Sequence, residues 1–104
     1  MKSDKSEQKV QLFFIYAEKC KHCNQMLSVI NLAIKKSKIP CDFKKFLYTT
    51  KAAINIALNN DIDDLPGLVV GAGVGVFCGN DYTEDRIVDA INKVAKSWKT
   101  TKNQ

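Results

Sequence analysis

Several features that would assign a sequence to a class at once are missing from these 104 residues. There is no run of about 20 apolar residues, which a membrane-spanning helix needs. Four cysteines are too few for a scaffold held together by disulfides. The lysines are not interleaved with aromatic residues and Arg86 is the single arginine, which argues against a nucleic-acid surface. We therefore expect neither a membrane nor a nucleic acid as partner.

The composition that is present describes one globular domain. A hydrophobic content of 45% and a charged content of 26% are ordinary for such a domain, and a chain of this length can enclose one core. Residues 1–9 are polar and of mixed charge, so we expect a flexible lead-in rather than an export signal. From these properties we predict a cytoplasmic monomer in a reducing compartment.

The net charge of +5 is concentrated in one part of the chain. Between Glu18 and Lys51 there are eight lysines, with only Glu18 and Asp42 as acidic residues. We interpret these lysines as a solvated face. Positive charge in this stretch would also favour a cysteine thiolate and attract anionic thiols.

Apolar periodicity divides the chain into seven elements. A nearly continuous apolar run over residues 10–16 suits a central strand that is buried on both faces. The predicted helices cover residues 21–36, residues 51–59 and the stretch from Thr83 to Trp98, and the other predicted strands cover residues 41–48, the run after Pro66 up to Gly71, and residues 74–78.

This order, β-α-β-α-β-β-α, implies an α/β domain over residues 10–98 with a mixed four-stranded sheet and helices on both of its faces. Threonines mark the starts of two helices, because a threonine side chain can accept a hydrogen bond from the first helical turn. The candidates are Thr50 or Thr49 for the second helix and Thr83 for the third. Residues 99–104 are expected to form a flexible tail.

The motif Cys20-Lys21-His22-Cys23 lies between the first strand and the first helix. A C-x-x-C motif in this position is typical of a redox centre, since the helix N-terminus stabilises a thiolate there. Cys20 would be the outer sulfur and the nucleophile, and Cys23 would close the disulfide. A lone C-x-x-C can equally be half of a zinc site, with His22 and Cys41 as further ligands.

Three landmarks occur in a meaningful order: the cysteine motif after the first strand, Leu65-Pro66 before the third, and Gly79 at the turn into the last helix. With these landmarks the chain resembles the thioredoxin fold, and within it the glutaredoxin branch. The resemblance covers about residues 10–97. In that family the proline at the position of Pro66 is cis and stands against the active-site sulfurs. The backbone of the residue before it, here Leu65, can hydrogen-bond an extended substrate.

Three features favour glutaredoxins over thioredoxins. The chain starts directly on the strand that leads to Cys20, Lys19 stands where thioredoxins carry a tryptophan, and Cys78-Gly79 resembles the glycine pair that borders the glutathione site. The departures from the glutaredoxin pattern are Lys21-His22 for Pro-Tyr, Asp64-Leu65 for Thr-Val, Cys78 for the first glycine and Ala17 for a lysine.

The resemblance implies a thiol–disulfide oxidoreductase that uses glutathione as its reductant and needs no metal. Its catalytic residues would be Cys20 and Cys23, and its partners would be glutathione and disulfide-containing proteins such as a ribonucleotide reductase. The substrate- and glutathione-binding residues that it implies are Lys19, His22, Leu65, Pro66, Gly79 and Asp81, with Glu84 as the alternative to Asp81.

Two other functions stay open from the sequence. One is a thioredoxin-like reductase that receives electrons from a flavoprotein reductase, and the other is a non-enzymatic module for metal binding or docking. The single histidine, His22, either favours the Cys20 thiolate or is an exposed loop residue. Cys41 and Cys78 are either inert thiols or redox partners, and Cys78 borders the presumed substrate groove.

Overall fold

The computed structural model describes residues 8–102, with side chains as far as residue 98. It confirms the predicted order of elements. The strands are β1 (Val10–Tyr16), β2 (Cys41–Leu47), β3 (Gly67–Val70) and β4 (Gly75–Cys78), and the helices are α2 (Lys21–Ser37), α3 (Lys51–Asn59) and α4 (Glu84–Lys102).

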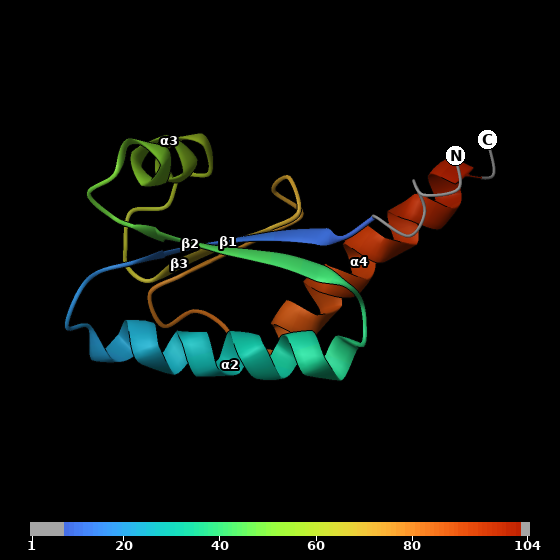
Figure 1. The fold of residues 1–104 in the computed structure, drawn as a ribbon, viewed down its shortest axis with the longest axis horizontal. Helices are drawn as coiled ribbons and strands as arrows, with labels where there is room; N and C mark the ends of the chain where they lie inside the picture. Colours follow the sequence, from blue (N-terminus) through green and yellow to red (C-terminus); the bar gives the residue numbers. More distant parts are fainter. Residues whose placement is uncertain (1–7, 103–104) are drawn as a thin grey trace.

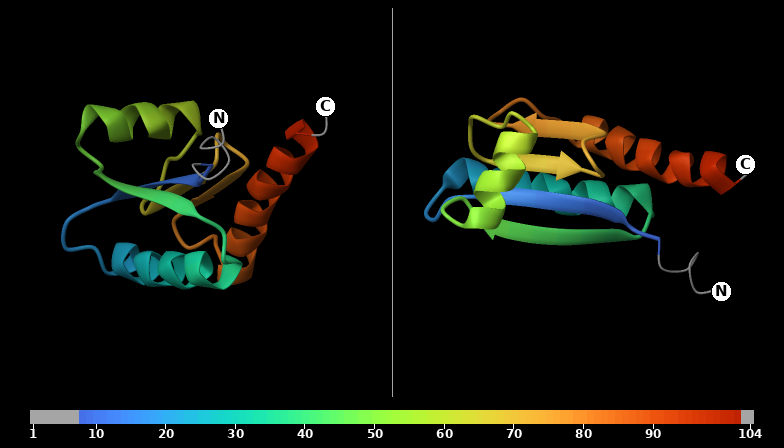
Figure 2. Two further views of the ribbon diagram at one scale, coloured as in Figure 1. Left: turned by 45° about the vertical axis from the view of Figure 1, so that its right-hand side comes forward. Right: turned by 90° about the horizontal axis from the view of Figure 1, so that it is seen from above.

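The four strands form one mixed sheet in the order β2-β1-β3-β4. β1 pairs with β2 in parallel and with β3 in antiparallel orientation, and β3 and β4 are antiparallel. Helices α2 and α4 lie on one face of this sheet and α3 lies on the other (Figures 1 and 2). The predicted sheet with helices on both faces is therefore confirmed.

The two faces of the sheet differ in how much apolar surface they bury. The larger cluster lies between the sheet, α2 and α4 and includes Leu12, Phe14, Met26, Ile30 and Ile87. The smaller cluster lies under α3 and consists of Ile15, Ala53, Ile62 and Val69. Burial of apolar area is the main source of folding free energy, so we expect α2 and α4 to be held more firmly than α3.

The ends of the helices follow from individual side chains. Thr50, rather than Thr49, caps α3: its Oγ1 accepts a hydrogen bond from the N–H of Ala53 at 3.3 Å. Thr83 Oγ1 accepts from the N–H of Arg86 at 3.2 Å at the start of α4, as predicted. Helix α2 ends at Ser37, because its C-cap Lys38 adopts a left-handed conformation that cannot continue the helix.

Helix α4 continues to Lys102 and so includes residues that we assigned to a flexible tail. The segment after Trp98 contains no glycine or proline that would end a helix. Residues 1–7 of the predicted lead-in and residues 103–104 of the tail lie outside the described residues, and the flexibility of both segments stays a prediction. Between residues 8 and 102, no helix is long and apolar enough to cross a membrane.

Candidate functional site

Cys20 and Cys23 form a disulfide at the N-terminus of α2, with their Cα atoms 5.2 Å apart. Strand β1 ends at Tyr16, and the chain turns through Lys19, whose φ of 53° is left-handed. Cys20 then serves as the N-cap of α2 in an extended conformation. The local sequence thus places Cys20 at the N-cap of α2 and Cys23 in the first turn of this helix.

Backbone N–H groups surround both sulfur atoms. The N–H of Cys23 donates to Cys20 Sγ at 3.1 Å, and the N–H of Ala17 lies 3.5 Å from Cys23 Sγ. The first turn of α2 contains no acidic residue, so no carboxylate there offsets the partial positive charge of the helix end. Cys20 is partly exposed whereas Cys23 is 3% exposed. This geometry suits Cys20 as the attacking sulfur and Cys23 as the inner one.

The peptide bond between Leu65 and Pro66 is cis, as the resemblance implied. In the antiparallel pairing of β1 with β3, Ile15 lies opposite Gly67. The pairing ends at this point, directly after Pro66 in β3 and one residue before the end of β1 at Tyr16. The proline loop therefore lies at the same end of β1 as the loop that leads to the disulfide.

The side chain of Asp64 lies against the backbone of Leu65 and of Gly79. The N–H of Leu65, which the resemblance assigned to an extended substrate, donates to Asp64 Oδ1 at 3.0 Å. A bound substrate strand would have to displace this carboxylate oxygen. Gly79 donates its N–H to the carbonyl of Pro66 at 2.9 Å, and a Cβ on Gly79 would stand 2.6 Å from Asp64 Oδ2. Leu65, Pro66 and Gly79 are therefore brought together, with Asp64 among them.

Asp81 and Glu84 are the two alternatives that the resemblance offered for binding the glutathione amino group, and both have cationic partners within the chain. Asp81 Oδ1 accepts from Arg86 Nη1 at 2.9 Å. Glu84 lies 3.3 Å from Lys36 Nζ, across the gap between α4 and α2. A ligand ammonium would therefore have to compete with an existing ion pair at either position.

Lys19, Lys21 and His22 are exposed around the cysteine motif. Lys19 precedes Cys20, and Lys21 and His22 are the first two residues of α2. All three polar side chains are therefore next to Cys20 in the chain. Their proposed roles in thiolate stabilisation and glutathione binding stay predictions.

The remaining cysteines are in different surroundings. Cys78 lies opposite Gly67 in the sheet, and burial together with the carboxylates of Asp63, Asp64 and Asp81 raises the pKa of its thiol. Burial also raises the pKa of Cys41, whose thiol donates to the carbonyl of Ile39 at 3.2 Å. From the sequence we named Asp81 as a binding residue, Asp64 only as a departure from the glutaredoxin pattern, and Asp63 not at all, although the adjacent aspartates before Leu65-Pro66 are a visible signal.

Cys41 cannot join the cysteine motif in a zinc site. It pairs with Val10 at the start of β1, whereas Cys20 follows the far end of that strand. A seven-residue strand separates these positions by roughly 20 Å. Among residues 8–102, no three or more histidine, cysteine, aspartate or glutamate side chains are arranged to hold a metal ion.

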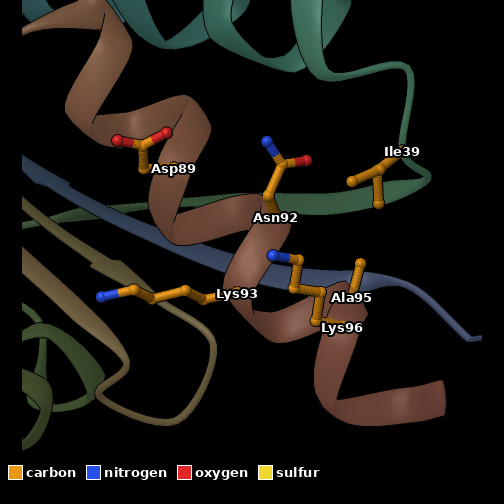
Figure 3. A pocket seen from close by; sticks show the side chains of 6 residues that line it. All are labelled: Ile39, Asp89, Asn92, Lys93, Ala95 and Lys96. Atoms are coloured by element: carbon orange, nitrogen blue, oxygen red, sulfur yellow. The ribbon is translucent and has the colours of Figure 1, made fainter. Parts of the chain in front are cut away.

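Two cavities of similar size lie at opposite ends of the fold. One, of about 460 Å³, lies beside the middle of α4 and the loop at Ile39 (Figure 3). That loop follows the end of α2, about 25 Å of helix away from Cys20. The other, of about 450 Å³, is lined by α3 and by the segment from Ile62 to Leu65. Only the second cavity adjoins the proline loop.

Comparison with solved structures identifies the architecture. An uncharacterized thioredoxin-like protein from Clostridium perfringens has a TM-score of 0.66 at 16% identity, covering 82% of this chain and 70% of its own. Thioredoxin 1 from Thermosipho africanus has a TM-score of 0.61 at 13% identity and covers 86% of this chain and 98% of its own. Mitochondrial thioredoxin 3 from Saccharomyces cerevisiae has a TM-score of 0.60 at 19% identity, and the match covers 84% of this chain and 80% of that protein.

No protein-family model matches the sequence, and no curated protein matches it either. These three neighbours are each less than 20% identical to this chain, so they establish the architecture and not the activity. Together with the sheet order, the three helices and the C-x-x-C disulfide at the start of α2, they show that this chain has the thioredoxin fold.

Proposed function

We propose that this protein is a thiol–disulfide oxidoreductase that works through Cys20 and Cys23. The observation that carries the proposal is the disulfide at the N-terminus of α2, with one sulfur partly exposed and the other buried beneath it. The cis-proline loop, which lies at the same end of β1 as this disulfide, and the thioredoxin fold of the chain support the same function.

In the proposed reaction the reduced protein transfers two electrons to a substrate disulfide. The Cys20 thiolate attacks one substrate sulfur, the substrate S–S bond breaks, and the first substrate thiolate leaves and takes a proton from solvent. Cys23 then loses its proton to solvent and attacks Cys20 Sγ. The second substrate thiol leaves, and the protein is left with the Cys20–Cys23 disulfide.

The oxidised protein must be reduced again, and glutathione is the first candidate reductant. Gly79 is held against the proline loop, and exposed lysines next to Cys20 could attract a glutathione carboxylate. In this scheme one glutathione forms a mixed disulfide with Cys20 and a second releases it. Lys19, His22, Leu65, Pro66, Gly79 and Asp81 would form the binding site.

A thioredoxin-like reductase that is served by a flavoprotein reductase is the second candidate, and specific contacts favour it. Asp81 and Glu84 already pair with Arg86 and Lys36. The carboxylates of Asp63 and Asp64 also lie where the resemblance places glutathione, which itself carries two carboxylates. Like charges at such a site weaken binding.

The test is thiol trapping after equilibration in glutathione buffers, with the products read by intact mass. We expect the wild-type protein to gain and lose one internal disulfide reversibly. In Cys23→Ser, a single glutathione adduct on Cys20 would support the glutathione-linked reaction. The matched control is Cys78→Ser, which keeps both catalytic thiols and should behave as the wild-type protein does.

Other outcomes separate the alternatives. Reversible oxidation without any adduct in Cys23→Ser would favour the thioredoxin-like reductase, and turnover with a flavoprotein reductase would then be measured. If Cys20 and Cys23 resisted oxidation and a metal ion accompanied the purified protein, the oxidoreductase proposal would be wrong.

A further inference from the structure

A groove of about 450 Å³ runs between α3 and the proline loop. Its floor is formed by Ile15 and Ile62, which belong to the smaller core cluster, and Ala53 closes it on the side of the helix. Leu65, the residue before the cis-proline, also lines it. The groove therefore adjoins the proline loop, at the end of β1 from which the chain continues to the disulfide.

Large apolar side chains gather around this groove although they are exposed to solvent. Tyr48 is 48% exposed, Ile54 is 47% exposed and Leu58 is 72% exposed, and all three line it. Exposed apolar residues scattered singly are normal, but a group of them along a concave surface is typical of an interaction site.

The charge of the groove is opposite to that of the whole protein. The chain carries a net charge of +5, yet among residues 8–98, whose side chains the structure describes, the charged residues that line the groove are Asp63 and Asp64, without any lysine. Both aspartates are exposed, and Asp64 also contacts the backbone of the proline loop. A partner that places a cation over these carboxylates would be attracted there, although the net positive charge of the protein repels cations overall.

The position of the groove determines what can reach it. A polypeptide whose disulfide lies at Cys20 would pass Leu65 and continue along α3, with one apolar side chain in the groove and the next residues over Asp63 and Asp64. A small disulfide would contact the cysteines and leave the groove empty. The groove therefore bears on the choice of polypeptide substrates only.

We propose that this groove selects disulfide-bearing polypeptides in which an apolar side chain and a lysine or arginine lie beside the reactive cysteine. The proposal rests on the proposed oxidoreductase function and specifies its substrate class. Its occupant is an extended basic segment of a partner protein, chosen by the complementary charge of the groove.

The experiment compares three synthetic peptides that contain the same internal disulfide. The first has a leucine and two lysines beside it, the second has a leucine and two glutamates, and the third has a serine and two lysines. We expect kcat/KM for the leucine–lysine peptide to exceed that for the leucine–glutamate peptide by about tenfold at low salt, since exposed charge pairs contribute modestly and are screened. The serine–lysine peptide should also be reduced more slowly than the first.

Variants connect this preference to the groove. Asp63→Asn should reduce the lysine preference by about threefold, whereas Asp89→Asn, on α4 outside the groove, should not. Leu58→Ser should reduce the preference for leucine over serine, whereas Leu32→Ser, at a leucine on α2 that is 53% exposed and lies outside the groove, should not. Each peptide rate is divided by the rate of the same variant with hydroxyethyl disulfide, so that changes in the dithiol itself cancel.

The controls separate the two proposals. If the reduced protein did not reduce hydroxyethyl disulfide at all, the oxidoreductase function itself would fail. If it reduced this compound but treated the three peptides alike, or preferred the glutamate peptide, the groove proposal would be overturned. Sedimentation of the wild-type protein tests a further occupant, because a dimer that Leu58→Ser dissociates would mean that a second copy covers the groove.

Discussion

The four thiols of the chain lie in four different surroundings. Cys20 accepts an N–H at the start of α2, Cys23 is buried beneath it, Cys41 is half-buried at the start of β2, and Cys78 lies beside a group of aspartates. Only the thiolate is a strong nucleophile, so these surroundings control which cysteine reacts. The differences are large enough to be measured residue by residue.

We expect iodoacetamide to modify Cys20 of the reduced protein first, and Cys78 at least about tenfold more slowly at neutral pH. Burial and nearby carboxylates raise the pKa of Cys78, so its alkylation rate should reach half its maximum at a pH above the ordinary value for a thiol. Below that pH its thiol stays protonated and slow. Asp63→Asn should shift this midpoint downward, and peptide mapping by mass spectrometry would follow both sites.

Equal labelling of Cys20 and Cys78 at neutral pH would contradict this assignment of the nucleophile. Asp89→Asn serves as the control, because this exposed residue is not among the groups that act on Cys78. Its labelling profile should match that of the wild-type protein.

At this scale the sequence identified reactive groups better than it identified their partners. Cys20, Cys23 and Pro66 could be placed because a short motif and its neighbouring strand fix their positions. Asp81 could not be judged in the same way. Its partner Arg86 follows a turn and the start of α4, and neither the spacing nor the composition says that the two side chains meet at 2.9 Å.

The N-cap of α3 and the N-cap of α4 can be removed separately, and only α3 lines the proposed groove. Thr50 Oγ1 accepts from the N–H of Ala53, and its hydroxyl donates to the carbonyl of Leu47 at 2.8 Å. Thr50→Ala removes both contacts, and we expect it to lower the free energy of unfolding by about 1 kcal/mol in urea denaturation. Because α3 forms one wall of the groove, the same variant should also weaken the preference for the leucine–lysine peptide.

Thr83→Ala is the matched control, since Thr83 caps α4 and that helix does not line the groove. It should lower the free energy of unfolding by a similar amount and leave the peptide preference as it is in the wild-type protein. A Thr50→Ala variant that lost stability but kept the full preference would show that the start of α3 does not shape the groove.

The elements were predictable wherever apolar periodicity and a capping residue agreed. Strand β1 and helix α3 have the predicted limits because a polar loop bounds each of them. The end of α4 was not predictable in this way: its apolar face stops at Trp98, but its backbone continues to Lys102. Loss of an apolar face removes a reason for a helix to pack and does not by itself break its hydrogen bonds.

For the molecule as a whole, the unequal burial on the two faces of the sheet has a consequence for dynamics. Helix α2 contributes Cys23, Met26, Ile30 and Ala33 to the core. Helix α3 contributes only Ala53, while Ile54 and Leu58 remain exposed. Elements with little buried apolar surface open locally at a lower free energy than the rest of a domain. The Cys20–Cys23 disulfide is therefore on the helix with the larger buried apolar surface, whereas the proposed substrate groove is beside the helix with the smaller one.

Amide hydrogen exchange would measure this difference directly. We expect the amides of α3 to exchange about 100-fold faster than those of the central turns of α2, which corresponds to a local opening that costs about 3 kcal/mol less.

The same measurement in the presence of the peptides tests whether occupation of the groove orders α3. The peptide with leucine and lysines should slow the exchange of α3, whereas the peptide with leucine and glutamates should leave it nearly unchanged. The central turns of α2 provide the internal control, since neither peptide touches them. Equal protection of α2 and α3 in the free protein would mean that the smaller core cluster, with Ile15, Ile62 and Val69, holds α3 as firmly as the larger cluster holds α2.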